Sequence, residues 1–166
     1  DDLEEKIGRK TSAIIPVNLF GNIVDSERVS EIADENELKV IYDSAQSIGS
    51  TFRGWESGAL GDMSCFSFYP TKVITTGEGG MVTTNDEGLH NFGKTLRSHG
   101  ETEKYLHESL GFNYRLTEIA SALGLSQMRR LDRYIERRRS IARYYDLAIG
   151  NIKGLVPQRI TENVES

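Results

Sequence analysis

Two short apolar segments enclose a helical pattern near the start of the chain. Residues 13–19 (AIIPVNL) predict a buried strand, although Pro16 lacks the N–H that a central strand needs. Ser26 suits the N-cap of an amphipathic helix that ends near Asn36, and residues 40–42 (VIY) form a second strand. A strand–helix–strand unit of this spacing predicts parallel strands joined by a right-handed crossover.

Two more strands are predicted in the middle of the chain, at residues 62–68 and 81–84. The glycine run at 77–80 (GEGG) lies between them. It lacks the spacing of a phosphate-binding loop and precedes a strand instead of a helix. We therefore expect a tight turn with positive φ angles there. The whole pattern predicts an α/β fold.

Helices dominate the second half of the predicted pattern. Asn85 and Asp86 precede a helix that extends from Glu87 to about Ser98. Thr117 begins a last helical region, which reads as two helices that meet near Gln127. The second of these is long and amphipathic.

Charge and composition argue against several classes of partner. The formal net charge is −5, and the arginines within residues 129–139 alternate with acids, which favours a solvated helix face over a nucleic-acid surface. No apolar run approaches the roughly 20 residues of a membrane span, and no signal peptide is visible. Cys65 is the only cysteine and the histidines lack metal-like spacing, so we expect a cytoplasmic protein without a metal site.

The two ends of the chain lack clear limits of their own. Residues 3–10 read as the tail of a helix, and residues 158–166 form a polar stretch without a packing pattern. From these features we expect the chain to be a central piece of a longer protein.

Polar side chains follow two of the predicted strands. In open parallel sheets, ligands bind beyond the carboxyl ends of the strands. Asp43, with Gln46 three residues later, follows one strand, and Lys72 follows another. An amine held away from water can attack an aldehyde, so Lys72 could be a nucleophile. Taken singly, each segment is better explained as a solvated turn.

Four segments together change this assessment. They are residues 43–46 (DSAQ), 66–72 (FSFYPTK), 77–80 (GEGG) and 111–115 (GFNYR), in this order. The series resembles the DegT/DnrJ/EryC1/StrS family of pyridoxal-phosphate-dependent sugar aminotransferases, from about Ala13 to about Tyr145.

The resemblance implies part of a fold-type I (aspartate aminotransferase-like) large domain, an α/β domain with a mostly parallel sheet and flanking helices. Residues 1–125 would belong to that large domain. Residues 126–166 would form a long helix that leads towards a small C-terminal domain.

The resemblance also implies a role for five residues toward pyridoxal 5′-phosphate (PLP). Lys72 matches the catalytic lysine that bonds covalently to the cofactor. Asp43 matches the carboxylate that pairs with the pyridine nitrogen, and Gln46 matches the residue beside the phenolic oxygen. Ser67 matches a hydroxyl donor to the cofactor phosphate. Asn113 matches an asparagine that reaches the phosphate of the neighbouring subunit's cofactor.

The implied activity is transfer of an amino group from an amino acid, usually glutamate, to a nucleotide-linked keto sugar. Such products serve cell-surface polysaccharides or secondary metabolites. Family members that carry histidine in place of Lys72 are dehydratases, so the lysine favours transamination. Asn18 departs from the histidine often seen at its position in the family.

The resemblance further implies a homodimer with a shared active site. Full family members continue beyond both ends of this chain, so we expect these 166 residues alone to have little or no transaminase activity. The alternative function is that of a non-catalytic regulatory or binding protein on the same fold.

Overall fold

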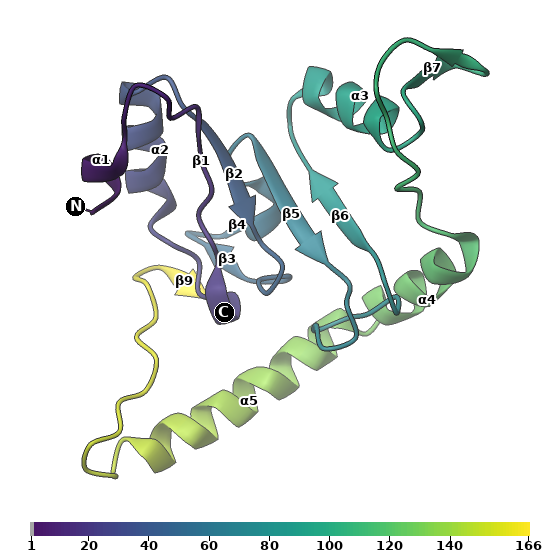
Figure 1. Cartoon of the computed structure of the whole chain (residues 1–166). Coiled ribbons are helices and arrows are strands. Elements are labelled where there is room, and N and C mark those ends of the chain that lie inside the picture. The colour runs from purple at the N-terminus through teal and green to yellow at the C-terminus, as the bar shows by residue number, and fades with distance from the viewer. Residues whose placement is uncertain (1) are drawn as a thin grey trace.

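A four-stranded sheet forms the centre of the protein in the computed structural model, which describes residues 2–166 (Figure 1). The strand order is β1 (Ala13–Ile14), β2 (Lys39–Asp43), β5 (Met63–Ser67) and β6 (Gly80–Thr83). β2 is parallel to both β1 and β5, whereas β6 is antiparallel to β5. The α/β fold with a mostly parallel sheet is therefore confirmed.

Helix α2 (Ser26–Glu35) connects β1 and β2 and packs against them. It ends as predicted at Asn36, whose Nδ2 donates to the Ile32 carbonyl at 2.8 Å. The short helix α1 (Asp2–Lys6) adds the partly buried Leu3 to the same core, and Ile7 follows directly after it. This core consists of Ile14, Val29, Ile32, Ala33, Val40 and Tyr42. Burial of these side chains is the main force that fixes β1 and β2 side by side.

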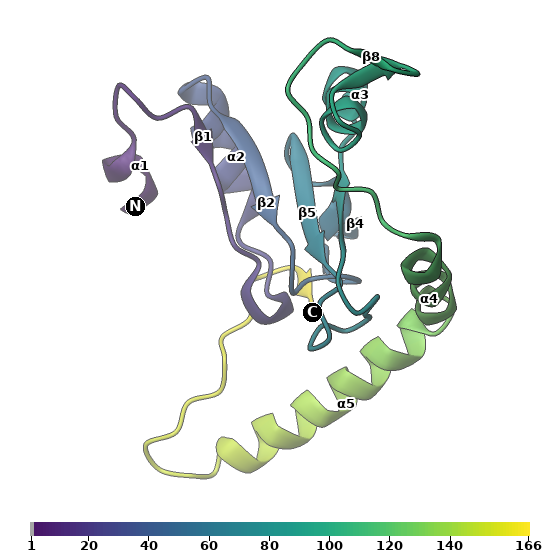
Figure 2. The same cartoon turned by 45° about the vertical axis from the view of Figure 1, so that its right-hand side comes forward.

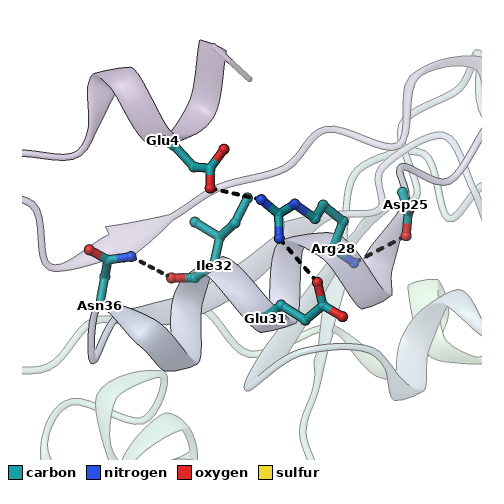
Figure 3. A network of polar contacts seen from close by, with 6 residues as sticks. All are labelled: Glu4, Asp25, Arg28, Glu31, Ile32 and Asn36. Atoms are coloured by element: carbon teal, nitrogen blue, oxygen red, sulfur yellow. Dashed lines mark hydrogen bonds and ion pairs between the residues drawn. The ribbon is translucent and has the colours of Figure 1, made fainter.

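The start of α2 differs from the prediction by one residue. Asp25, not Ser26, is the N-cap, and its Oδ1 accepts the Arg28 N–H at 3.1 Å (Figure 3). A carboxylate at this position also suits the positive end of the helix. Arg28 then pairs with Glu4 of α1 at 2.7 Å and with Glu31 at 3.2 Å. These partners, the hydrogen bond to Glu31 first, raise the pKa of Arg28, and the pair with Glu4 joins α1 to α2.

The first predicted strand is shorter than residues 13–19. Regular pairing stops at Ile14, and an isolated bridge between Val17 and Asp43 continues the parallel register. Pro16 interrupts the ladder because it has no N–H to donate, although its carbonyl accepts from the Asp43 N–H at 2.9 Å. The one-turn helix η1 (Leu19–Gly21) follows.

A second, small sheet was not predicted. It has the order β4 (Trp55–Glu56), β3 (Thr51–Phe52) and β9 (Val164–Glu165), with antiparallel pairs. Arg53 and Gly54 join β3 to β4 with φ angles of +49° and +82°, as a tight hairpin requires. The expectation that residues 158–166 have no packing pattern is therefore wrong, because β9 pairs with β3.

The helices after the central sheet agree with the sequence patterns. Asp86 caps α3 (Glu87–Leu96), and Thr117 caps α4 (Glu118–Met128) through hydrogen bonds to main-chain N–H groups. The predicted break near Gln127 is confirmed, since α5 (Leu131–Ile149) begins after α4 ends.

Between α3 and α4 the chain forms a small hairpin of β7 (Glu101–Glu103) and β8 (Leu106–His107). A second one-turn helix, η2 (Ser57–Ala59), precedes β5. The division of the chain into a large domain (residues 1–125) and a following helical segment (residues 126–166) stays a prediction.

No helix within residues 2–166 combines the length and the apolar character needed to cross a membrane.

The long helix α5 lies across the carboxyl ends of two central strands. In Figures 1 and 2 the arrowheads of β2 and β5 point toward the side on which α5 runs. This is the edge of the sheet at which polar residues were predicted to gather.

Candidate active site

The parallel strands β2 and β5 deliver two predicted site residues to one edge of the sheet. Asp43 is the last residue of β2 and Ser67 is the last residue of β5. Asp43 pairs in register with Cys65, so Ser67 lies two residues further along the same direction. The strand register thus gathers a carboxylate and a hydroxyl where a ligand would bind.

The Asp43 carboxylate is half-buried and has no cationic partner within residues 2–166. Its Oδ1 accepts the Ala45 N–H at 3.0 Å, which fixes the side chain. Burial, and then the nearby charge of Asp43, raise the pKa of the Cys65 thiol. A partly desolvated carboxylate of this kind favours a positively charged ligand group.

Gln46 is held in one orientation by the main chain of η1. Its Oε1 accepts the Phe20 N–H at 3.0 Å. Phe20 has a φ of +58°, a left-handed conformation that is uncommon for an aromatic residue. Because the oxygen of the amide faces Phe20, its NH2 group faces away and can donate to a ligand.

Lys72 ends a turn that begins directly after β5. Its N–H donates to the Tyr69 carbonyl at 3.0 Å. The Ser67 Oγ accepts the Tyr69 N–H at 3.3 Å, which leaves the serine O–H available as a donor. The Lys72 side chain is partly buried, and its Nζ makes no hydrogen bond or ion pair with any residue from 2 to 166.

The glycine run closes this loop onto β5. Gly77 and Gly79 have φ angles of +82° and +151°, so the predicted turn with positive φ is confirmed. Phe68 donates its N–H to the Gly79 carbonyl at 2.9 Å and accepts from the Thr76 N–H at 3.0 Å. Hydrogen bonds on both sides of Phe68 therefore hold the loop that carries Lys72.

A pocket of about 440 Å³ lies between this edge of the sheet and α5. Gln46 and Lys72 line it from the loops after β2 and β5. From α5 the lining residues are Ile135, Arg138, Arg139 and Ala142. Sequence reasoning placed the arginines on a solvated face, and Arg138 is indeed exposed, but it did not place Arg138 and Arg139 beside a pocket. The signal was their spacing with Ile135 and Ala142, which puts all four on one side of the helix.

Asn113 lies apart from the other predicted site residues. It is exposed in the segment between β8 and α4, next to Ser98 in an isolated bridge, and does not line the pocket. Its Oδ1 accepts from the Arg115 Nε at 3.2 Å. Within a single chain, then, four of the five predicted residues follow β2 and β5 at one edge of the sheet, but only Gln46 and Lys72 line the pocket, and Asn113 lies elsewhere.

Asn18 is a buried polar residue behind the site. Its Nδ2 donates to the Ser44 Oγ at 3.2 Å, and its Oδ1 accepts the Val24 N–H at 3.3 Å. Asn18 and Ser44 are both fully buried. Asn18 thereby supports the chain that follows Asp43 and satisfies the polar groups around it.

Comparison with known proteins gives consistent matches along the chain. The DegT/DnrJ/EryC1/StrS aminotransferase family matches residues 1–166. GDP-perosamine synthase from Caulobacter vibrioides is 42% identical over 152 residues, which are 90% of this chain and 41% of that protein. A pleiotropic regulatory protein from Geobacillus stearothermophilus is 42% identical over 144 residues, 86% of this chain and 39% of that protein.

A solved structure extends this similarity to three dimensions. The PLP-form of a putative sugar aminotransferase from Streptococcus pneumoniae matches with a TM-score of 0.88 and 30% identity, over 99% of this chain and 48% of that chain. The present chain spans about two fifths of the length of the curated relatives it matches. The protein belongs to the DegT/DnrJ/EryC1/StrS aminotransferase family.

Proposed function

We propose that the protein is a PLP-dependent aminotransferase that moves an amino group from an amino acid, with glutamate as the first candidate, to a nucleotide-linked keto sugar. One observation carries this proposal. The Lys72 amine and the Asp43 carboxylate lie at the same edge of the sheet, and neither has a partner of opposite charge within residues 2–166. A structural role would favour pairing such groups, because unpaired charges are costly away from water.

The groups at this edge suit PLP. Lys72 would bond to its aldehyde, Asp43 would face its ring nitrogen, and the NH2 group of Gln46 would donate to its phenolic oxygen. Ser67 would donate to its phosphate. A pocket of about 440 Å³ is also of the size that small-molecule ligands use. When bound, PLP supplies an electron sink for the substrate carbon.

Each of these site residues then has a proposed role in the reaction. The Asp43 charge would keep a facing ring nitrogen protonated. The Lys72 amine would move a proton at the substrate carbon as a general base and acid. The NH2 group of Gln46 would hold the phenolic oxygen through a hydrogen bond. We further propose that Asn113 serves the site of a second subunit, and that the reaction takes place in the cytoplasm.

The test uses the natural gene product with Lys72→Ala beside Lys153→Ala, which removes an exposed lysine outside the pocket. We expect the Lys72 variant to lose both the visible absorption band of lysine-bound cofactor and turnover with glutamate and keto-sugar nucleotides. The Lys153 variant should retain both. Wild-type protein without such a band would overturn the proposed chemistry.

A regulatory role is the second candidate, and the match to a pleiotropic regulatory protein favours keeping it. The same variant separates the two functions. A regulator that does not use the amine keeps its cellular phenotype after Lys72→Ala, whereas an enzyme loses it. The 166 residues expressed alone should show little or no turnover, since they cover 41% of the matched synthase.

A further inference from the structure

One face of α5 forms a wall of the pocket opposite Lys72. The lining residues Ile135, Arg138, Arg139 and Ala142 follow the spacing i, i+3, i+4 and i+7, which places them on one side of a helix. Arg137 lies between them in sequence but does not line the pocket. The helix therefore presents two of its arginines to the site, and its other basic residues lie elsewhere.

A close contact fixes this face at the pocket. Gly49 has a φ of +79°, and a Cβ added to it would collide with the Ile135 Cδ1. A methyl group at Gly49 would have to displace the Ile135 Cδ1, and glycine leaves room for it. Ile135, one turn before Arg138, therefore packs against the loop that follows Gln46.

The charged side chains that line this pocket are all basic. Its described lining contains Lys72, Arg138 and Arg139, and no aspartate or glutamate side chain. The Arg139 Nε donates to the main-chain oxygen of Ser166 at 2.8 Å. Arg138 makes no hydrogen bond or ion pair with any residue in the described range 2–166.

The acids of α5 do not line this pocket, although Asp132 and Glu136 line an adjacent cavity that Arg139 shares. Glu136 pairs with Arg143 at 2.9 Å, and neither residue lines this pocket. Asp132 and Asp146 also lie outside its lining. A guanidinium without a partner, in a pocket of ligand size, is suited to a charge-assisted and often bidentate bond with an oxyanion.

We propose that Arg138, supported by Arg139, is the anion-recognising residue of this pocket and binds an oxyanion group of a substrate. This inference deepens the proposed function and rests on it for the choice of substrate. The shared chemistry is a pair of anionic oxygens, which either the carboxylate of an amino-acid donor or the diphosphate of a nucleotide sugar supplies. Arg138 holds the substrate, and Lys72 acts on it.

The test measures binding of two unreactive probes, glutarate and inorganic pyrophosphate, to the natural gene product with PLP added. Isothermal titration compares wild type with Arg138→Ala, Arg138→Lys and Arg137→Ala. Arg137→Ala is the matched control, because it removes the same charge from the same helix outside the pocket. We expect Arg138→Ala to weaken one probe about tenfold or more, Arg138→Lys to weaken it less, and Arg137→Ala to leave it unchanged.

The probe that is lost identifies the source of the anion. Loss of glutarate alone assigns Arg138 to the amino donor, and loss of pyrophosphate alone assigns it to the nucleotide sugar. The proposal is overturned if Arg138→Ala binds both probes as tightly as wild type does. It is also overturned if Arg137→Ala weakens probe binding as much as Arg138→Ala does. Because neither probe reacts, the result is independent of whether Lys72 performs transamination.

Discussion

The side chains at the edge of the sheet differ in how they are held. Gln46 accepts from Phe20 and Ser67 accepts from Tyr69, so each keeps its donor group available. Among residues 2–166, Asp43 is fixed through one carboxylate oxygen. These arrangements orient the groups without neutralising them, as preorganised binding sites require.

Replacing Asp43 with asparagine tests the role of charge at that position. The amide oxygen can still accept the Ala45 N–H, so the local structure should persist. We expect turnover to fall roughly 30- to 1000-fold, equivalent to about 2–4 kcal/mol, because a partly buried charge interaction is lost. Steady-state kinetics would measure the effect, with thermal unfolding as the check that the fold is intact. Full activity in Asp43→Asn would remove this residue from the site.

A second carboxylate, Asp62, serves stability instead. Its oxygens accept from the Lys39 Nζ at 2.7 Å and from the Val40 N–H at 2.8 Å. Burial opposes ionisation of Asp62, but these two bonds outweigh it and lower its pKa. The group therefore stabilises the fold above the unfolded-state pKa of about 3.9, and this contribution is lost as pH falls through the lower folded-state pKa.

We accordingly expect Asp62→Asn to lower the free energy of unfolding by about 0.5–1 kcal/mol at pH 6, a modest value because Lys39 is largely exposed. At pH 3 the difference from wild type should shrink. Urea denaturation at both pH values measures it, with Asp34→Asn as a control at an exposed site. A difference that grows toward acid pH would contradict this account.

Sequence reasoning placed the candidate site residues that follow strands at one edge of the sheet, and their role in a site stays a prediction. Asp43 and Lys72 could be predicted because parallel strands bring their carboxyl ends to one edge. Arg138 could not, since its place in the pocket depends on how α5 crosses that edge. A solvated helix face and a pocket wall have the same local pattern, and the tertiary placement of α5, with Ile135 beside Gly49, distinguishes them.

At the scale of elements, the approach of α5 to the sheet depends on Gly49. Gly49→Ala places a methyl group against the Ile135 Cδ1 and forces alanine into a left-handed conformation, which costs about 1–2 kcal/mol by itself. We expect lower thermal stability and, because the helix is displaced, weaker binding of the anionic probe at Arg138.

The variant Ile135→Val provides a control for this steric effect, because valine lacks the colliding Cδ1. In the Ile135→Val background, Gly49→Ala should lower the free energy of unfolding less than it does in wild type. A double-mutant cycle should give a coupling energy of about 0.5 kcal/mol or more. The cost of the backbone conformation should remain. Strict additivity of the two changes would show that Gly49 does not set the position of α5.

The elements that the sequence predicted are those with a local signal. β2, β5 and α2 have apolar runs or helical periodicity, and α3 and α4 have capping residues in the expected places. The two-residue strands β3, β4 and β9 are too short to show periodicity. β9 forms only because the distant β3 offers it a free edge, and such a pairing cannot be read from a polar segment.

At the scale of the whole molecule, one region is rich in exposed apolar side chains. Tyr114, Ile119 and Leu125 are 69%, 85% and 65% exposed, and the rings of Phe112 and Tyr114 stack with centroids 4.9 Å apart. An apolar surface of this kind is typical of protein interfaces. Asn113 lies within it, away from the pocket of its own chain. This placement supports the proposal that Asn113 completes the site of a second subunit.

Mixing two inactive variants tests this sharing directly. Lys72→Ala removes the amine from its own site, and Asn113→Ala removes the group that we propose each subunit lends to its partner. In a mixed dimer, one site carries both defects and the other carries neither. Random exchange makes about half of the dimers mixed, so the mixture should regain about a quarter of wild-type activity.

The controls decide between sharing and independent sites. Each variant alone should have little activity after the same treatment, and a mixture of Lys72→Ala with Asp43→Asn should gain nothing. Both of those changes affect groups that one chain brings to a single edge, so each site in a mixed dimer remains defective. If Asn113 acted within its own chain, the first mixture would likewise stay inactive. Recovery in the first mixture alone would therefore assign Asn113 to the partner's site.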